Sequence, residues 1–337
     1  MLPAAKFLQS YFGGSMRIRT PLSVVVPCYN EQAVLPALHE RLSTVCRGLG
    51  TDYEIVFIND GSRDATWDAM ADLAARDPHL VCVNLSRNYG HQLALSAGLR
   101  ECTGDAVVVL DADLQDPPEL LPDMLAVMRR ENADVVYGKR VSRAGESWQK
   151  RAFARLFYWG LAKLSEVPIP RDVGDFRLMS RRVVEGLTAL PEHHRYIRGM
   201  VSWLGYKQVA FEYHREPRAA GLSHYNFQRM SRLALDAVTG FSVRPLTFAL
   251  KAGGVCLAAA VLTLAAALWS WAGGSVPTGG LLAALFLALA GGQFLAIGIV
   301  GEYLGRMFSE VRGRPLFVID QVLRSTHGAI HPRREAA

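Results

Sequence analysis

VVVLDADLQDPPE, residues 107–119, leads from an apolar run directly into two carboxylates, Asp111 and Asp113. The run, extended by Ala106, is typical of a strand that is covered on both faces. Because unpaired charge is costly to bury, the acidic pair belongs at the end of that strand and not in the core. Carboxylates one residue apart suit a hard divalent cation and the phosphates that it neutralises. The stretch therefore predicts an α/β enzyme that handles a nucleotide diphosphate.

Four further β-branched runs accompany this strand, and a helical stretch follows each of the five. Continuous apolar runs indicate strands buried on both faces, so we predict a mostly parallel sheet. The predicted strands span 22–27, 53–60, 80–86, 105–113 and 134–140, and the predicted helices about 31–49, 64–76, 90–101, 117–131 and 147–164.

Polar side chains follow every one of these strands. Right-handed crossovers place the carboxyl ends of parallel strands at one edge of the sheet, where ligands bind in open α/β folds. Polar residues at all five ends therefore predict one shared site. These residues are Tyr29, Asn30, Glu31, Asn59, Asp60, Arg87, Asn88, His91, Asp111, Asp113, Lys139 and Arg140.

The C-terminal third contains two charge-free apolar spans, 252–272 and 279–301, of 21 and 23 residues. At about 1.5 Å per residue each reaches the roughly 30 Å of a bilayer's hydrocarbon. Basic residues flank only the outer ends of the pair, so both ends are expected to face the cytoplasm. A buried hairpin in a soluble fold is the alternative, and two successive charge-free spans disfavour it. Glycine pairs in both spans permit close helix packing, which leaves a homo-oligomer open.

The remaining segments complete a predicted plan of the chain. The N-terminus lacks the apolar core of a signal peptide, so the main domain is expected in the cytoplasm. The segment before the spans is mixed in polarity and fits either an interfacial amphipathic helix or an ordinary surface helix. The plan is an extension over 1–20, a catalytic domain over 21–225, an interfacial helix over 226–250, two transmembrane helices over 251–305 and a basic cytoplasmic tail over 306–337.

Charge and cysteine content restrict the partners. The net charge of +6 suits phosphate groups, anionic lipid or nucleic acid. Neither an aromatic RNA-binding pattern nor zinc-finger spacing is present in the sequence, so nucleic acid is not expected as a partner. Five cysteines without a CxxC pair predict free thiols in a reducing compartment.

Four motifs occur in a fixed order: SVVVPCYNE (23–31), INDGS (58–62), DADLQDPPE (111–119) and GDFRLMSR (174–181). With the apolar spans behind them, they resemble family 2 glycosyltransferases that load sugars onto polyprenyl phosphate, such as bactoprenol glucosyltransferases and dolichyl-phosphate mannose synthases. The resemblance implies a GT-A-like, Rossmann-type domain at the cytoplasmic membrane. It also implies inverting transfer of one hexose from a nucleotide sugar to undecaprenyl phosphate. UDP-glucose is the favoured donor, and GDP-mannose and an amino sugar are the alternatives.

The resemblance implies roles for donor-side residues. Asp60 matches a nucleotide contact, although Asp-Gly-Ser is also turn chemistry in its own right. Oxygen ligands suit Mg²⁺ or Mn²⁺ and not zinc, and Asp116 after them is interpreted as a helix N-cap. The implied nucleotide and donor contacts are Pro27, Tyr29, Glu31, Asp60, Asp111 and Asp113, and the implied metal ligands are Asp111, Asp113 and Gln115.

On the acceptor side, the resemblance implies Asp175 as a catalytic residue beside Asp113. Its role stays open between general base and positioning group, because a phosphate monoester with a second pKa near 6 is mostly ionised at pH 7. Arg195 and Arg198 are further phosphate candidates or residues that face anionic headgroups, while His91 is interpreted as a residue of packing or loop order. The implied acceptor-phosphate contacts are Arg140, Arg143, Arg218, Ser223 and His224, the last at a position where the family more often has Lys.

Two other functions compete with this interpretation. A processive polysaccharide synthase would need a QxxRW-type motif, which the sequence lacks, and more than two spans to build a channel. A membrane adaptor without activity would keep the fold but has no need for intact acids at 111, 113 and 175.

Overall fold

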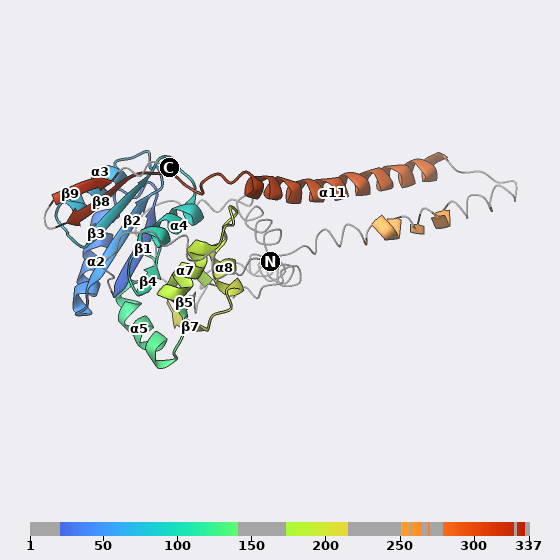
Figure 1. Cartoon of the computed structure of the whole chain (residues 1–337). Coiled ribbons are helices and arrows are strands. Elements are labelled where there is room, and N and C mark those ends of the chain that lie inside the picture. The colour runs from blue at the N-terminus through green and yellow to red at the C-terminus, as the bar shows by residue number, and fades with distance from the viewer. Residues whose placement is uncertain are drawn as a thin grey trace, which may run out of the picture.

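The computed structural model describes residues 21–140, 173–214, 279–326 and 329–333, with short runs and single positions between 251 and 269. Its strands are β1 (Leu22–Cys28), β2 (Tyr53–Asn59), β3 (Leu80–Leu85), β4 (Ala106–Val109), β5 (Val135–Arg140), β6 (Val173–Ser180), β7 (Gln208–Tyr213), β8 (Ile319–Thr326) and β9 (Ala329–Arg333). Among the described residues they form one nine-stranded sheet, in the order β7-β5-β6-β4-β1-β2-β3-β8-β9. Figure 1 shows the sheet with its helices, and a long helix, α11 (Gly279–Val311), that projects from it.

The predicted α/β class and mostly parallel sheet are confirmed. β1 pairs in parallel with β2 and β4, and β2 with β3. The five predicted apolar runs coincide with β1 to β5, and every residue of β1 and β2 is buried. Continuous apolar runs thus correspond to central strands that are covered on both faces.

Successive side chains of each strand point to opposite faces of the sheet, so apolar strands leave an apolar surface on both faces. Helices cover each of these surfaces. Val24 and Val26 enter one apolar core, and Val25 enters the other. The first core contains side chains of α2 (Leu35–Gly48), α3 (Thr66–Ala74) and α5 (Leu121–Arg130). The short 3₁₀ helix η1 (Pro118–Leu120) directly precedes α5. The second core contains side chains of α4 (His91–Glu101), α7 (Arg181–Ala189) and α8 (Ile197–Trp203). The predicted helix over 147–164 and the predicted segments 1–20 and 226–250 lie outside the described residues.

β6 is antiparallel to both of its neighbours, β4 and β5. Its register pairs Val109, the last residue of β4, with Arg177. Continuing that register by two residues places Asp175 opposite Asp111, beyond the end of β4. The antiparallel strand thereby brings the two carboxylates, which are far apart in the sequence, to the same edge of the sheet.

The segment after α11 returns to the sheet, so part of the predicted basic tail over 306–337 belongs to the folded domain. β8 pairs antiparallel with β3, and its residues Val322 and Leu323 are buried. Arg324 of β8 donates to the main-chain carbonyl and the carboxylate of Glu101, at 2.9 and 3.1 Å. The tail prediction missed this strand because its pairing partner lies more than 200 residues earlier in the chain.

Glu54 at the start of β2 fastens the end of the sheet opposite the polar edge. Its Oε1 accepts hydrogen bonds from the hydroxyls of Ser23 at 2.6 Å and Thr103 at 2.9 Å. Its other oxygen lies 3.9 Å from Arg324. Glu54→Ala leaves the buried Ser23 hydroxyl and the half-buried Thr103 and Arg324 without their carboxylate, so we expect the free energy of unfolding to fall by about 2–3 kcal/mol.

Urea unfolding in detergent, followed by tryptophan fluorescence, measures this change in stability. Glu40→Ala is the matched control, because Glu40 is an exposed glutamate on α2 and surface changes stay within about 0.5 kcal/mol. Equal stability of the two variants would contradict the fastening role of Glu54.

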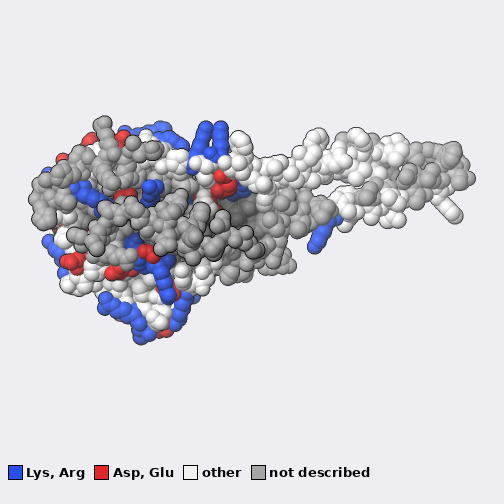
Figure 2. All heavy atoms as spheres, in the orientation of Figure 1, with Lys and Arg blue, Asp and Glu red and all other residues white. Residues whose placement is uncertain are grey.

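α11 is long and apolar enough to cross a membrane. The qualifying stretch is Ala288–Val311, and none of it is buried against the rest of the structure. Apolar side chains such as Phe286, Phe294 and Ile297 are exposed, and the described atoms of the projecting part in Figure 2 are mostly uncharged. Among the described residues this is the one qualifying helix, and the predicted span over 252–272 falls mostly outside them. The predicted two-helix hairpin is therefore not confirmed.

Candidate active site

The loops that follow β1 and β2 hold each other at the carboxyl edge of the sheet. Asn30 accepts a hydrogen bond from the amide of Arg63 at 2.8 Å, and the Glu31 amide donates to the Thr66 hydroxyl at 2.9 Å. Tyr29 is 41% exposed at this edge. Two of the predicted nucleotide contacts, Tyr29 and Glu31, therefore lie on a loop with a fixed shape. Pro27, another of the predicted nucleotide contacts, is buried within β1.

Asp60 has a structural task that the sequence did not reveal. It is buried, and its two oxygens accept hydrogen bonds from the amides of Tyr89 at 2.7 Å and Gly90 at 2.9 Å. Burial raises the pKa of Asp60 against the effect of these two amides. Gly90 has a φ of 94°, which favours glycine, and the next residue, His91, begins α4. Asp60 thus fixes the loop that presents His91.

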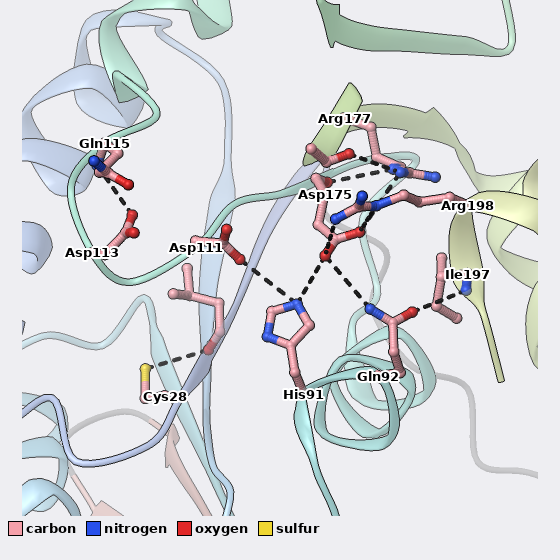
Figure 3. Close-up of polar contacts among 12 residues, drawn as sticks. Cys28, His91, Gln92, Asp111, Asp113, Gln115, Asp175, Arg177, Ile197 and Arg198 are labelled. Atoms are coloured by element: carbon pink, nitrogen blue, oxygen red, sulfur yellow. Dashed lines mark hydrogen bonds and ion pairs between the residues drawn. The ribbon is translucent and has the colours of Figure 1, made fainter. Parts of the chain in front are cut away.

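His91 lies between two carboxylates at the edge of the sheet (Figure 3). Its Nε2 is 3.1 Å from Asp175 and 3.6 Å from Asp111. Although desolvation opposes the positive charge, the hydrogen bond to Asp175 and the charge of Asp111 raise the pKa of His91 to about 9. The interpretation of His91 as a packing residue is therefore wrong.

Asp175 is surrounded by hydrogen-bond donors and positive charge. Arg198 forms a two-pronged ion pair with it, at 2.8 Å through Nε and 3.1 Å through a terminal nitrogen. The Arg177 guanidinium lies 3.7 Å away, and Gln92 donates at 3.5 Å. Against the effect of burial, Arg198 and His91 hold the pKa of Asp175 well below its usual range. A carboxylate in this setting is a weak proton acceptor.

The same network joins three elements on one face of the sheet. His91 and Gln92 begin α4, Arg198 belongs to α8, and Asp175 and Arg177 lie on β6. Gln92 also accepts a hydrogen bond from the amide of Ile197, so it links α4 to the start of α8. The sequence signal for this arrangement was the polar HQ pair after β3.

Asp111 stands in a group of negative charges. Burial raises its pKa to about 6, against the effect of His91, and three neighbouring carboxylates add to the rise. Those neighbours are Asp175, Asp116 and Asp113. Asp111, His91 and Asp175 each offer one ligand atom within 4.8 Å of the others. Three carboxylates and one imidazole thus act on Asp111 at this edge of the sheet.

The three predicted metal ligands are not gathered at one point. Figure 3 shows Asp113 and Gln115 facing each other on the loop after β4, apart from the network around Asp111. The Asp113 carboxylate accepts a hydrogen bond from the main-chain amide of Gln115 at 3.2 Å. His91, which was not predicted as a ligand, is the side chain that faces Asp111 instead.

Asp116 is not the helix cap that the sequence suggested. It is fully buried, and it accepts a hydrogen bond from the Tyr213 hydroxyl at 2.5 Å. Arg140 donates to the same hydroxyl at 3.4 Å. A Cβ atom on Gly174 would come within 2.6 Å of the Arg140 guanidinium, so this glycine leaves room for that side chain next to Asp175.

The remaining predicted phosphate contacts divide into two groups. Arg195 is buried and donates to the main-chain carbonyls of Leu187 and Leu190, at 2.7 and 2.6 Å. It therefore holds the backbone and is not a free phosphate ligand. Four predicted contacts lie outside the described residues, namely Arg143, Arg218, Ser223 and His224.

Comparison with known proteins identifies the family. The model of glycosyl transferase family 2 matches residues 23–188. The SfII prophage-derived bactoprenol glucosyl transferase of Shigella flexneri is 39% identical over 303 residues, covering 88% of this chain and 97% of that protein. The prophage bactoprenol glucosyl transferase homolog of Escherichia coli (strain K12) is 38% identical over 308 residues, covering 89% and 99%.

A solved structure is also similar to this chain. The mannosyltransferase PcManGT from Pyrobaculum calidifontis, in complex with GDP-Man and Mn²⁺, is 20% identical with a TM-score of 0.44. The match covers 88% of this chain and 87% of that one. The family model and the two bactoprenol relatives confirm the resemblance found in the four sequence motifs. The chain belongs to glycosyl transferase family 2.

Proposed function

We propose that this protein transfers one hexose from a nucleotide sugar to the phosphate of a polyprenyl phosphate, with inversion, at the cytoplasmic face of a membrane. The observation that carries the proposal is the junction of Asp111 and the Asp175–Arg198 pair through His91 at one edge of the sheet. A donor diphosphate at the first group and an acceptor phosphate at the second would stand next to each other. Such an arrangement favours in-line attack.

The oxygen chemistry of the donor-side residues suits a divalent cation, while the side chain of Asp113 lies apart from Asp111 in this structure. Oxygen donors from Asp111 and Asp113 suit Mg²⁺ or Mn²⁺, and burial together with three neighbouring carboxylates raises the pKa of Asp111. Bound there, the cation would supply positive charge for the departing nucleoside diphosphate. Gln115 is a further oxygen ligand in the proposal. Asp175 is a poorer ligand, because Arg198 and Arg177 already compensate its charge.

On the acceptor side, we assign Asp175 a positioning role. It orients the Arg198 guanidinium, whose planar fork suits a phosphate as well as a carboxylate. Arg140, held over Gly174 by the Tyr213 hydroxyl, is the second phosphate-binding candidate. The acceptor phosphate is mostly ionised at pH 7, so it needs charge neutralisation more than proton removal.

The path of the chain supports the proposed membrane hairpin. β8 follows α11 and pairs with β3, so the segments before and after the apolar region belong to one sheet. If α11 crosses the membrane, the chain between 214 and 279 must cross it in the other direction. The predicted span over 252–272 has the length for that crossing. Both ends of the chain would then lie on the cytoplasmic side, with the active site near the lipid headgroups.

UDP-glucose remains the favoured donor, because two similar proteins are named as bactoprenol glucosyl transferases. We expect the purified protein, given UDP-glucose and a short polyprenyl phosphate, to form a lipid-linked monosaccharide in Mg²⁺ or Mn²⁺. In excess chelator the rate should fall by at least about 10²-fold, the size of effect expected for lost charge stabilisation.

A panel of UDP-glucose, GDP-mannose and UDP-linked amino sugars tests the donor, with radiolabelled lipid product as the readout. Preference for GDP-mannose would replace the donor and keep the reaction class. Equal turnover in chelator would remove the metal from the proposal, and polymer in place of a monosaccharide lipid would contradict the single-transfer reaction.

A further inference from the structure

His193 joins the end of α11 to the catalytic domain through its main-chain amide and its ring. The His193 amide donates to one oxygen of Glu310 at 2.9 Å, and its ring Nδ1 lies 2.9 Å from the other. Its ring Nε2 lies 2.6 Å from the carbonyl oxygen of Arg314. In Figure 1 the loop between α7 and α8, which carries His193, reaches the domain end of α11.

The chemistry of the two acceptors fixes the charge of His193. A carboxylate and a main-chain carbonyl can only accept hydrogen bonds, whereas a neutral imidazole has a single N–H to donate. Two ring nitrogens that both face acceptors therefore require an imidazolium. Consistently, the hydrogen bonds to Glu310 and to the Arg314 carbonyl raise the pKa of His193. Among the described residues, the other basic side chains that act on the His193–Glu310 pair are Arg195 and His194.

Hydrogen bonds and a short chain segment connect the loop that carries His193 to the active site. Arg195 holds this loop through the carbonyls of Leu187, Leu190 and Glu192. Five residues after His193, the side chain of Arg198 forms the ion pair with Asp175. A displacement of α11 relative to the loop would therefore change the place of Arg198 relative to the membrane.

We propose that His193 is a positioning residue, whose imidazolium clamps the end of α11 and so sets the height of the Arg198–Asp175 pair above the lipid headgroups. This inference rests on the proposed function, because it requires α11 to lie in the membrane. The substrate that depends on the clamp is the lipid acceptor. The nucleotide sugar arrives from water and does not depend on it.

The sign of the pH dependence follows from the raised pKa of His193. The clamp is complete below the ordinary histidine pKa of 6.5 and is lost as the pH rises through the raised value. In the wild-type protein, the KM for the lipid acceptor should therefore increase on the alkaline side. Variants without the histidine should lack this increase.

The test uses the full-length protein in lipid nanodiscs, with His193→Gln and Glu310→Gln removing the clamp from either side. His194→Gln is the matched control, because His194 is the exposed neighbour. Hydrogen–deuterium exchange of residues 305–314 should become about fivefold faster in both clamp variants, as expected for loss of a partly exposed ion pair. The KM for membrane-embedded polyprenyl phosphate should rise about fivefold, with kcat and the donor KM within about twofold of wild type.

Two results would overturn the positioning role. One is unchanged exchange in both clamp variants, and the other is faster exchange with an unchanged KM for the lipid acceptor. The exchange measurement needs no substrate, so it separates a missing clamp from a wrong assignment of the reaction. If no nucleotide sugar supports transfer but the exchange responds, the clamp exists and the proposed function has failed.

Discussion

Asp111→Asn should lower kcat/KM for sugar transfer by about 10²–10³-fold, the usual effect of removing one electrostatic contact to a transition state. Asp111 lies at the carboxyl edge of the sheet, where burial and three neighbouring carboxylates raise its pKa to about 6 against the effect of His91. Asparagine keeps the shape but carries no charge, so the proposed cation would lose a charged ligand. The affinity for UDP should then become nearly independent of Mn²⁺, which calorimetric titrations with and without the metal will measure.

Asp105→Asn provides the matched control for this variant. Asp105 precedes β4 and is exposed, at the end of the strand opposite Asp111. The control removes one carboxylate from the same part of the chain, and its kinetics should stay within about twofold of wild type. Should Asp111→Asn turn over like this control and keep its response to Mn²⁺, the cation would have to bind elsewhere.

The sequence allowed the central sheet and its functional edge to be predicted because both follow from local patterns. Apolar runs of the right length identify buried strands, and the polar residues behind them then have to share one edge. The predicted runs coincide with β1 to β5, and Asp111 lies at the expected edge. These features depend only on residues that are neighbours in the chain.

β6 escaped prediction because its sequence contradicts the pattern of a central strand. Asp175 and Arg177 are charged, yet both are buried, and Phe176 and Leu178 point to the opposite face. Charge is tolerated there only because the two side chains and Arg198 compensate one another. Such compensation depends on Arg198, which lies 23 residues after Asp175 on a helix that no local pattern contains.

β8 escaped prediction for a different reason. Its alternating pattern is compatible with a strand, but the pattern does not say which strand it joins. The side chain of Asn84, near the end of β3, donates a hydrogen bond to the carboxylate of Asp320, which lies 236 positions later in the sequence. β8 can pair only with a strand edge that other strands leave open and that lies within reach of the end of α11. The sequence alone contains neither fact.

The second large effect concerns Asp175 and decides between a base and a positioning group. Asp175→Asn leaves Arg177 and Arg198 without their common counter-charge, so we expect the free energy of unfolding to fall by about 3–5 kcal/mol. We also expect kcat/KM to fall by about 10²-fold or more, because Arg198 is no longer oriented. Thermal unfolding and steady-state kinetics at saturating donor will measure the two effects.

A double-mutant cycle separates the two roles of Asp175. If the aspartate acts through Arg198, then Arg198→Gln alone should cause a similar loss, and adding Asp175→Asn should lower kcat/KM little further. If the aspartate instead removes a proton, the two losses should multiply. Arg182→Gln is the control, because Arg182 forms an ion pair with Asp134 away from this edge. Asp175 already accepts hydrogen bonds from an arginine, a histidine and a glutamine. Such a carboxylate has little capacity left to take a proton from the acceptor. We therefore expect the outcome in which Asp175 acts through Arg198.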